Sequence, residues 1–293
     1  MCSICLFKMD TAFFLKWVVV LFEVKEVYSG INKFNIYHHE LNDLELNNII
    51  SKMLFEKSAL NYIFTANEDN IDSNYIDMAR RFIPEVFFYR EKEILDKWEQ
   101  NKIVIEKMMK RNYSFYSFYA EALMAYLNYK VLNISLVSGV VSVDETLSDQ
   151  KTGADACMFN DGIVILGEAK FYKDFNAGRN KIIEDFSSKS LINKINNLYR
   201  KSHKTLVHFK AINGESKSIF LEEFLKYNIV LSGFVLHNKK RQYSYEKIDN
   251  VDPSTVISNY SIVFYHLPIN SKEDLIYLVI KQALELIVNE SRK

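Results

Sequence analysis

The spacing of apolar residues predicts helices over about 42–63 and 91–110, where apolar side chains recur every three or four positions beside polar faces. Pro84 interrupts the chain between these two segments, since proline breaks a helix interior. A third helix is predicted over about 114–130. Its apolar residues keep the spacing of one packed face: Phe115, Phe118, Tyr119, Ala122, Leu123, Tyr126 and Leu127.

Strand-forming residues dominate the next part of the chain, at about 131–143, 154–159 and 163–169. The unbroken run Ile163–Leu166 is typical of a strand that is buried on both faces. A long helix is predicted over about 176–200, strands at about 228–237 and 261–267, and a last helix at about 271–289. From residue 114 onward the predicted order begins with a helix, three strands, a helix and a strand. This order predicts a mixed α/β (α+β) fold.

An early apolar segment surrounds Trp17–Phe22, but Lys16 divides it and leaves it short of the roughly 20 residues that cross a bilayer. It also lacks the small-residue cleavage site of an exported protein. We interpret it as a β-rich core segment. We therefore expect neither export nor membrane insertion, and we expect a cytoplasmic protein.

The composition indicates that the chain folds, and its charge is unevenly distributed along the sequence. Of 293 residues, 48% are hydrophobic and 25% charged, far from the composition of disordered chains. The 37 basic and 37 acidic residues cancel, which argues against a uniformly basic nucleic-acid coat. Residues 40–100 nevertheless hold 13 acidic and 7 basic residues, whereas residues 168–210 hold 4 acidic and 10 basic residues. We therefore divide the chain into an acidic, partly helical amino-terminal region, 1–110, and a domain spanning 111–293.

Two acidic residues flank a predicted hairpin in the second region. Asp155 precedes it and Glu168 ends the buried strand, with a turn expected near Gly162. Lys170 lies two residues after Glu168, so both side chains point to the same face of the strand. Charges at the end of an apolar strand are costly unless they compensate one another or a cation joins them. Mg²⁺ suits such a pair, because it is commonly held by one or two carboxylates plus a substrate phosphate.

The acid-x-Lys pattern alone is a weak signal. It occurs four times, at Glu23/Lys25, Asp149/Lys151, Glu168/Lys170 and Glu215/Lys217. The first also follows an apolar run and has Asp10 upstream at the same spacing. Too little chain precedes it, however, to supply a helix and a first strand, so the pattern at 168–170 is favoured on structural context.

Taken together, a glutamate on a helix, an aspartate on a strand and Glu168-Ala169-Lys170 on the next strand resemble the PD-(D/E)XK nuclease superfamily. The string Leu166–Asp174 is similar, more narrowly, to the HamA family, the nuclease subunits of the Hachiman anti-phage defence system. The likeness covers about residues 114–200. This chain has Ala154 where the superfamily often has proline before the first acid.

The resemblance implies a role for each matching residue. Asp155 and Glu168 would bind Mg²⁺ or Mn²⁺ together with the Ala169 carbonyl, and Lys170 would orient or activate the attacking water. Glu121, at the edge of the predicted helix stripe, would complete the acidic site. The implied activity is metal-dependent cleavage of DNA phosphodiester bonds without sequence specificity, in anti-phage defence with a helicase subunit as partner. Residues 111–293 would then be a PD-(D/E)XK nuclease domain, and the acidic 40–100 segment could dock the helicase or shield the basic stretch.

A basic stretch follows the predicted site, and such residues supply sequence-independent affinity for phosphates. Four of its members are our candidate nucleic-acid contacts: Lys173, Arg179, Lys181 and Lys189. The same stretch also contains Lys194, Arg200, Lys201 and Lys204, and Tyr172 and Tyr199 are candidates for stacking on unpaired bases.

Two alternatives stay open from the sequence. One is a nuclease-like fold without catalysis, a binding module whose acidic cluster is structural. The other is a restriction-type or junction-resolving nuclease, which would prefer a specific sequence or a branched substrate.

Overall fold

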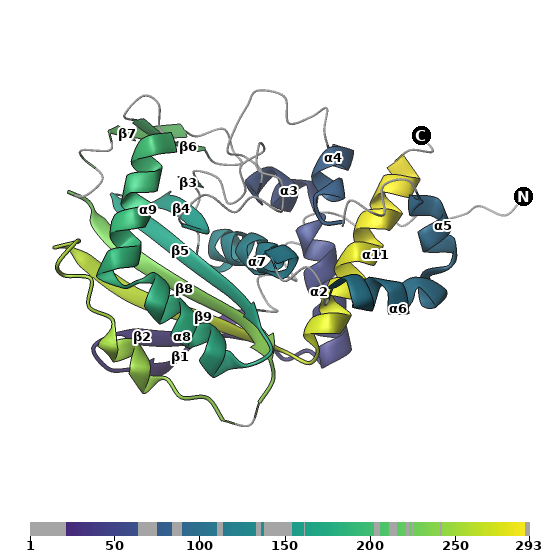
Figure 1. The fold of residues 1–293 in the computed structure, drawn as a ribbon, viewed down its shortest axis with the longest axis horizontal. Coiled ribbons are helices and arrows are strands. Elements are labelled where there is room, and N and C mark those ends of the chain that lie inside the picture. Colours follow the sequence, from purple (N-terminus) through teal and green to yellow (C-terminus); the bar gives the residue numbers. More distant parts are fainter. Residues whose placement is uncertain are drawn as a thin grey trace, which may run out of the picture.

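The computed structural model describes residues 22–63, 75–83, 90–109, 114–132, 136–137, 154–160, 162–201, 206–210, 216–220, 223, 226–240 and 242–290. The fold combines helices with one mixed sheet (Figure 1). Residues 1–21 and 138–153 lie outside the described residues. The structure therefore does not test the interpretation of Trp17–Leu21 as part of a β-rich core segment.

The first part of the chain contains a strand pair that the sequence analysis did not predict. It is followed by helices, and the elements up to the end of α7 are β1 Glu23–Ser29, β2 Lys33–His38, α2 Asp43–Leu54, α3 Lys57–Ile63, α4 Tyr75–Arg80, α5 Glu91–Asp96, α6 Trp98–Met109 and α7 Ser114–Leu132. The helix predicted over 42–63 is divided into α2 and α3, and the one predicted over 91–110 into α5 and α6. A side-chain cap starts α2, where the Asn42 oxygen accepts from the Glu45 N–H at 3.0 Å.

The second part carries most of the sheet. Its elements are β3 Leu136–Val137, β4 Ala156–Asn160, β5 Ile163–Tyr172, α8 Phe175–Asp185, α9 Ser188–Lys201, β6 Leu206–Lys210, β7 Ser216–Phe220, β8 Asn228–Asn238, a 3₁₀ helix (η3) Glu246–Asn250, β9 Tyr260–Ile269 and α11 Lys272–Glu290. The predicted helix over 176–200 is therefore two helices, and the pair β6 and β7 lies between α9 and β8.

The nine strands of the described residues form one sheet in the order β1-β2-β9-β8-β5-β4-β3-β6-β7. Strands β5, β8 and β9 are parallel neighbours, while β4 is antiparallel to β5. Parallel strands are usually covered on both faces, and the apolar run at the start of β5 is typical of that environment. Strand β5 is accordingly almost entirely buried from Val164 to Phe171.

Helices cover both faces of the sheet (Figure 1). On one face, α8 packs through Ile182, α9 through Leu191 and the junction between them through Phe186, all against alternating residues of β5 such as Leu166. On the other, α7 packs against the intervening residues, including Ala169. The two faces of β5 therefore meet two different helical layers.

The amino-terminal helices share a core with the carboxyl-terminal helix. Leu46 and Ile50 of α2 belong to the same buried cluster as Ile280 and Leu284 of α11. Figure 1 shows α11 among α2, α4, α5 and α6. The boundary at 110/111 stays a sequence prediction, and the packed core extends across it. None of the helices in the described ranges is both long and apolar enough to cross a membrane.

Candidate active site

The hairpin of β4 and β5 brings Asp155 beside the part of β5 that carries Glu168. Ala156 pairs with Gly167 at the end of the antiparallel ladder, and Asp155 directly precedes that pair. The Asp155 N–H donates to the Gly167 carbonyl at 3.0 Å. The predicted turn is present, with Gly162 at φ +83°, a left-handed conformation that glycine adopts without strain.

The Asp155 carboxylate is fixed by the backbone of β5. Its Oδ2 accepts a 2.8 Å hydrogen bond from the Ala169 N–H. The N–H and the carbonyl of one strand residue point to the same edge of the strand. The Ala169 carbonyl therefore lies on the edge that carries Asp155, which is the position the sequence analysis expects for a third oxygen ligand.

Lys170 lies at the centre of three carboxylates. Its Nζ is 3.5 Å from Asp155 Oδ2, 3.2 Å from Glu168 Oε2 and 3.0 Å from Asp185 Oδ2. The structure thus brings together three residues that the sequence analysis selected and adds Asp185, the last residue of α8. The Lys170 side chain is only 16% exposed, so water screens these interactions weakly.

A second buried lysine contacts Glu168 from α9. The Lys194 ammonium forms an ion pair with Glu168 Oε1, and the two side chains are 9% and 3% exposed. Each oxygen of Glu168 therefore has its own ammonium partner. We refer to Asp155, Glu168, Lys170, Asp185 and Lys194 as the charged cluster.

Asp185 and Lys194 were not selected from the sequence as site residues. A signal for Lys194 existed, because it follows the buried Leu191 by three positions and precedes the buried Ile195, which puts a lysine within the apolar stripe of α9. Asp185 had no comparable signal, since an acid at the end of a helix is ordinarily a solvated residue.

The electrostatic environment holds Lys170 as a cation. Burial alone would lower the pKa of Lys170, but the carboxylates of Asp155, Glu168 and Asp185 together raise it above the ordinary lysine value. Lys170 is therefore suited to stabilising negative charge and to orienting a water, and it is poorly suited to removing a proton from one.

The surroundings of Glu168, in contrast, disfavour its charged form. Burial and the neighbouring Asp155 carboxylate raise the pKa of Glu168 above its ordinary value, and the ammoniums of Lys194 and Lys170 oppose this rise. A buried carboxyl in this state gains from any additional positive charge. That is an electrostatic requirement which a divalent cation would meet.

The donor chemistry at this edge fits Mg²⁺ or Mn²⁺. Among the described residues, no group of three or more His, Cys, Asp or Glu side chains is arranged to hold a metal by itself. Two carboxylates and a backbone carbonyl are nevertheless a usual protein contribution for Mg²⁺, which keeps several waters. In the structure the ammoniums of Lys170 and Lys194 supply positive charge to the oxygens of Glu168.

Glu121 lies on the helix that covers the other face of β5. It is 8% exposed, and Met124, one turn further along α7, has its methyl group over Gly167. Glu168 and Lys170 face α8 and α9 instead, because side chains alternate along a strand. Glu121 therefore occupies the opposite layer, and its participation in the site stays a prediction.

The four candidate nucleic-acid contacts differ in accessibility. Lys181 and Lys189 on α8 and α9 are exposed, and Lys181 forms a 2.8 Å ion pair with Glu184. Lys173 is 70% exposed and pairs with Glu273 at 2.5 Å.

Arg179 is different, because only 2% of it is exposed. Its guanidinium donates to the Ser244 carbonyl and to Asn176 and Asn180. Arg179 thus fixes the 242–245 loop to α8, and we remove it from the proposed nucleic-acid surface. The side chains of Tyr199, Arg200, Lys201 and Lys204 are outside the described part.

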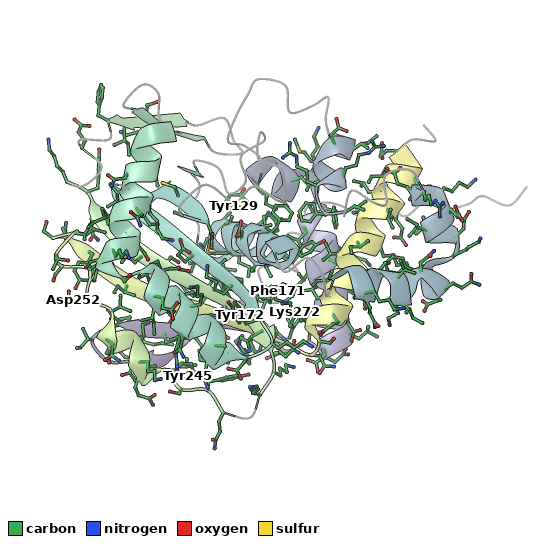
Figure 2. All side chains as sticks on the ribbon, in the orientation of Figure 1. Tyr129, Phe171, Tyr172, Tyr245, Asp252 and Lys272 are labelled. Carbon is green, nitrogen blue, oxygen red and sulfur yellow. The ribbon has the colours of Figure 1, made fainter. Side chains whose placement is uncertain are left out.

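The end of β5 is anchored to the start of α11. The Lys272 Nζ donates to the Phe171 carbonyl at 2.8 Å and lies 4.6 Å from the centroid of the Phe171 ring. Figure 2 shows these two residues side by side, with Tyr172 next to them. Tyr172 is 37% exposed, so its ring is accessible at the end of the strand that carries the charged cluster.

The rival pattern near the amino terminus has a different environment. Glu23 and Lys25 lie on the edge strand β1, 3.7 Å apart, with side chains 68% and 46% exposed. Asp10 lies outside the described residues. The described pair is a solvated surface ion pair, which favours 168–170 as the site.

No family model, curated protein or solved structure matches this chain.

Proposed function

We propose that the chain is a metal-dependent nuclease that hydrolyses DNA phosphodiester bonds at the charged cluster. The observation that carries the proposal is the convergence of Asp155, Glu168 and Lys170 on the face of the sheet that α8 and α9 cover, with both carboxylates within 3.5 Å of a single ammonium. Acids from two adjoining strands with a lysine alongside are the arrangement that the resemblance to PD-(D/E)XK nucleases led us to expect.

Each residue has a distinct role in this proposal. Asp155, Glu168 and the Ala169 carbonyl hold the divalent ion, which when bound supplies a nucleophile at neutral pH and offsets charge on the phosphate. The hydrogen bond from the Ala169 N–H fixes the orientation of the Asp155 carboxylate. Lys170 orients the attacking water and stabilises the negative charge that develops on the phosphate, because its carboxylate neighbours keep it protonated.

The exposed lysines of α8 and α9 would bind the DNA backbone. Lys181 and Lys189 lie on the two helices that also supply Asp185 and Lys194 to the charged cluster. Phosphate contacts of this kind carry no sequence information. We therefore propose cleavage without sequence specificity.

The defence role and the helicase partner depend on the resemblance of Leu166–Asp174 alone. We propose that the chain acts in anti-phage defence with a helicase subunit. Plaque assays with this gene expressed alone and together with a candidate helicase gene test this part: protection should require both genes and should vanish with Glu168→Gln. Protection that survives Glu168→Gln would contradict it.

One observation favours a second candidate, a binding module without catalysis. Both oxygens of Glu168 already have an ammonium partner, so the cluster is compensated within the chain. Such a module would bind no divalent ion at Asp155 and would leave DNA intact.

The deciding experiment incubates the purified protein, alone and with a candidate helicase partner, with linear, circular and single-stranded DNA, with and without Mg²⁺. Glu168→Gln and Lys170→Met should abolish degradation. Glu184→Gln, an exposed acid beside Asp185, is the matched control and should degrade DNA as the wild type does. Degradation by all four proteins, or by none in the presence of the partner, would contradict the proposal.

A further inference from the structure

Glu168 has one ammonium on each carboxylate oxygen, and the two lysines come from different elements of the fold. Lys170 also contacts Asp155 and Asp185, so its position does not depend on Glu168. Lys194 approaches from α9 and contacts the other oxygen, Oε1. Lys194 lies on a different helix from Asp185, and the resemblance assigns no role to it.

A divalent ion on Glu168 would conflict with Lys194 at its present position. The ammonium lies within ion-pair distance of Oε1, and both side chains are almost fully buried. A metal ion bound to Glu168 would lie close to this ammonium, and like charges repel strongly where water cannot screen them. The metal and the Lys194 ammonium therefore compete for the same carboxylate.

The charge of Lys194 is carried on a flexible four-carbon stem, so the ammonium can move while the backbone of α9 stays in place. Lys170 also contacts Asp185 at 3.0 Å, a carboxylate outside the proposed ligand set, which can hold Lys170 when a metal occupies Asp155 and Glu168. The two lysines thus have separable roles.

We propose that Lys194 is a place-holder cation, which compensates Glu168 in the metal-free protein and is displaced when a divalent ion binds. This inference rests on the proposed metal site. It makes Lys194 a positioning residue that keeps the buried carboxylate in place until the metal arrives, and it makes metal affinity depend on a residue outside the ligand set.

The first test titrates Mn²⁺ calorimetrically into the wild type and into Lys194→Met and Lys194→Gln. The glutamine amide can still donate to Glu168, which keeps that variant folded if the methionine variant is not. Removing the competing charge should lower the Kd for Mn²⁺ by about tenfold in both variants. Lys247→Met, at an exposed lysine of η3 to which no role is assigned, is the control and should leave the Kd unchanged.

Thermal unfolding supplies a readout that does not depend on activity. Without metal, both Lys194 variants should melt below the wild type, because a buried carboxyl has lost one partner. Addition of Mn²⁺ should raise their Tm by more than it raises that of the wild type. An equal or smaller rise would contradict the inference.

A second test needs no variant. Amine labelling of the wild-type protein, read by mass spectrometry, should modify Lys194 faster when Mg²⁺ is present, because displacement exposes its ammonium. Lys189 serves as the internal reference.

The failures of the two proposals are distinguishable. If Mn²⁺ binds the wild type but not Asp155→Asn, while the Lys194 variants bind it equally or more weakly and Mg²⁺ does not increase Lys194 labelling, only the place-holder role is overturned. If Mn²⁺ binds none of these proteins, the metal site and the inference are both overturned.

Discussion

The two buried histidines of β8 and β9 should make the protein unstable in mild acid. His237 Nδ1 lies 2.8 Å from the Asn238 carbonyl, His237 Nε2 lies 2.9 Å from His266 Nδ1, and His266 Nε2 lies 3.3 Å from the Tyr245 hydroxyl. A carbonyl only accepts, so His237 Nδ1 carries the proton, His266 Nδ1 donates to His237 Nε2 and the hydroxyl donates to His266 Nε2. This chain of hydrogen bonds is complete with both rings neutral.

The aromatic surroundings oppose protonation of either ring. The His237 and His266 rings stack at 5.1 Å, and both contact Phe175 and Tyr243. Burial lowers the pKa of His237 from 6.5 to about 4, and burial and the neighbouring ring lower the pKa of His266 well below its ordinary value.

The direction in which pH changes the free energy of unfolding depends on which state, folded or unfolded, takes up protons. Below pH 6.5 the unfolded chain binds protons on both histidines, whereas folded His237 stays neutral until about pH 4. The free energy of unfolding therefore falls as the pH falls through this window. His237 alone accounts for a loss of about 2 kcal/mol at pH 5 relative to pH 7.5, and about 3 kcal/mol at pH 4.

Urea unfolding followed by circular dichroism at pH 7.5, 6 and 5 measures this loss. The variant His237→Gln keeps an acceptor for His266 and does not titrate, so it should lose about 2 kcal/mol less than the wild type between pH 7.5 and 5. His38→Gln, a less buried histidine, should follow the wild type. Identical losses in the wild type and in His237→Gln would refute the reasoning.

Three further outcomes follow from particular contacts. Gly233→Ala should destabilise the fold by about 1–3 kcal/mol in chemical denaturation, because a Cβ there would lie 2.8 Å from the ring of Phe264; wild-type stability would contradict this packing. Lys181→Ala and Lys189→Ala should each reduce the slope of log Kd against log salt for DNA by about one, measured by fluorescence anisotropy, and unchanged slopes would remove α8 and α9 from the interface. Arg179→Ala should lower the Tm without changing that slope, because its guanidinium fixes the 242–245 loop; a changed slope would return it to the DNA surface.

The sequence predicted those parts of the fold that depend on strong local patterns. The apolar run of β5 and the glycine turn before it are local signals, and each is present. Helix α7 is present too, but it is buried on all sides from Phe118 to Asn128 and not along one face only. The hairpin of β1 and β2 was missed because β1 carries Glu23, Lys25 and Glu26 and lies at a sheet edge, where burial does not impose an apolar pattern.

The features of the site that were not predicted depend on contacts between residues far apart in the sequence. The helix predicted over 176–200 divides at Phe186–Ser187, and this break ends α8 at Asp185, beside Lys170. The periodicity of α9 identified its buried stripe but did not show that Lys194 within it meets Glu168, 26 residues earlier. Similarly, a run of basic residues could not distinguish exposed Lys189 from buried Arg179, because their exposure depends on the loop that packs over α8.

Calorimetric titration of Mn²⁺ into the wild type and into Asp155→Asn tests the central claim most directly. The account predicts one site in the wild type and none in Asp155→Asn, with both proteins folded by circular dichroism. Equal binding by the two proteins, or no binding by the wild type, would show that the acids of β4 and β5 do not form a divalent-metal site.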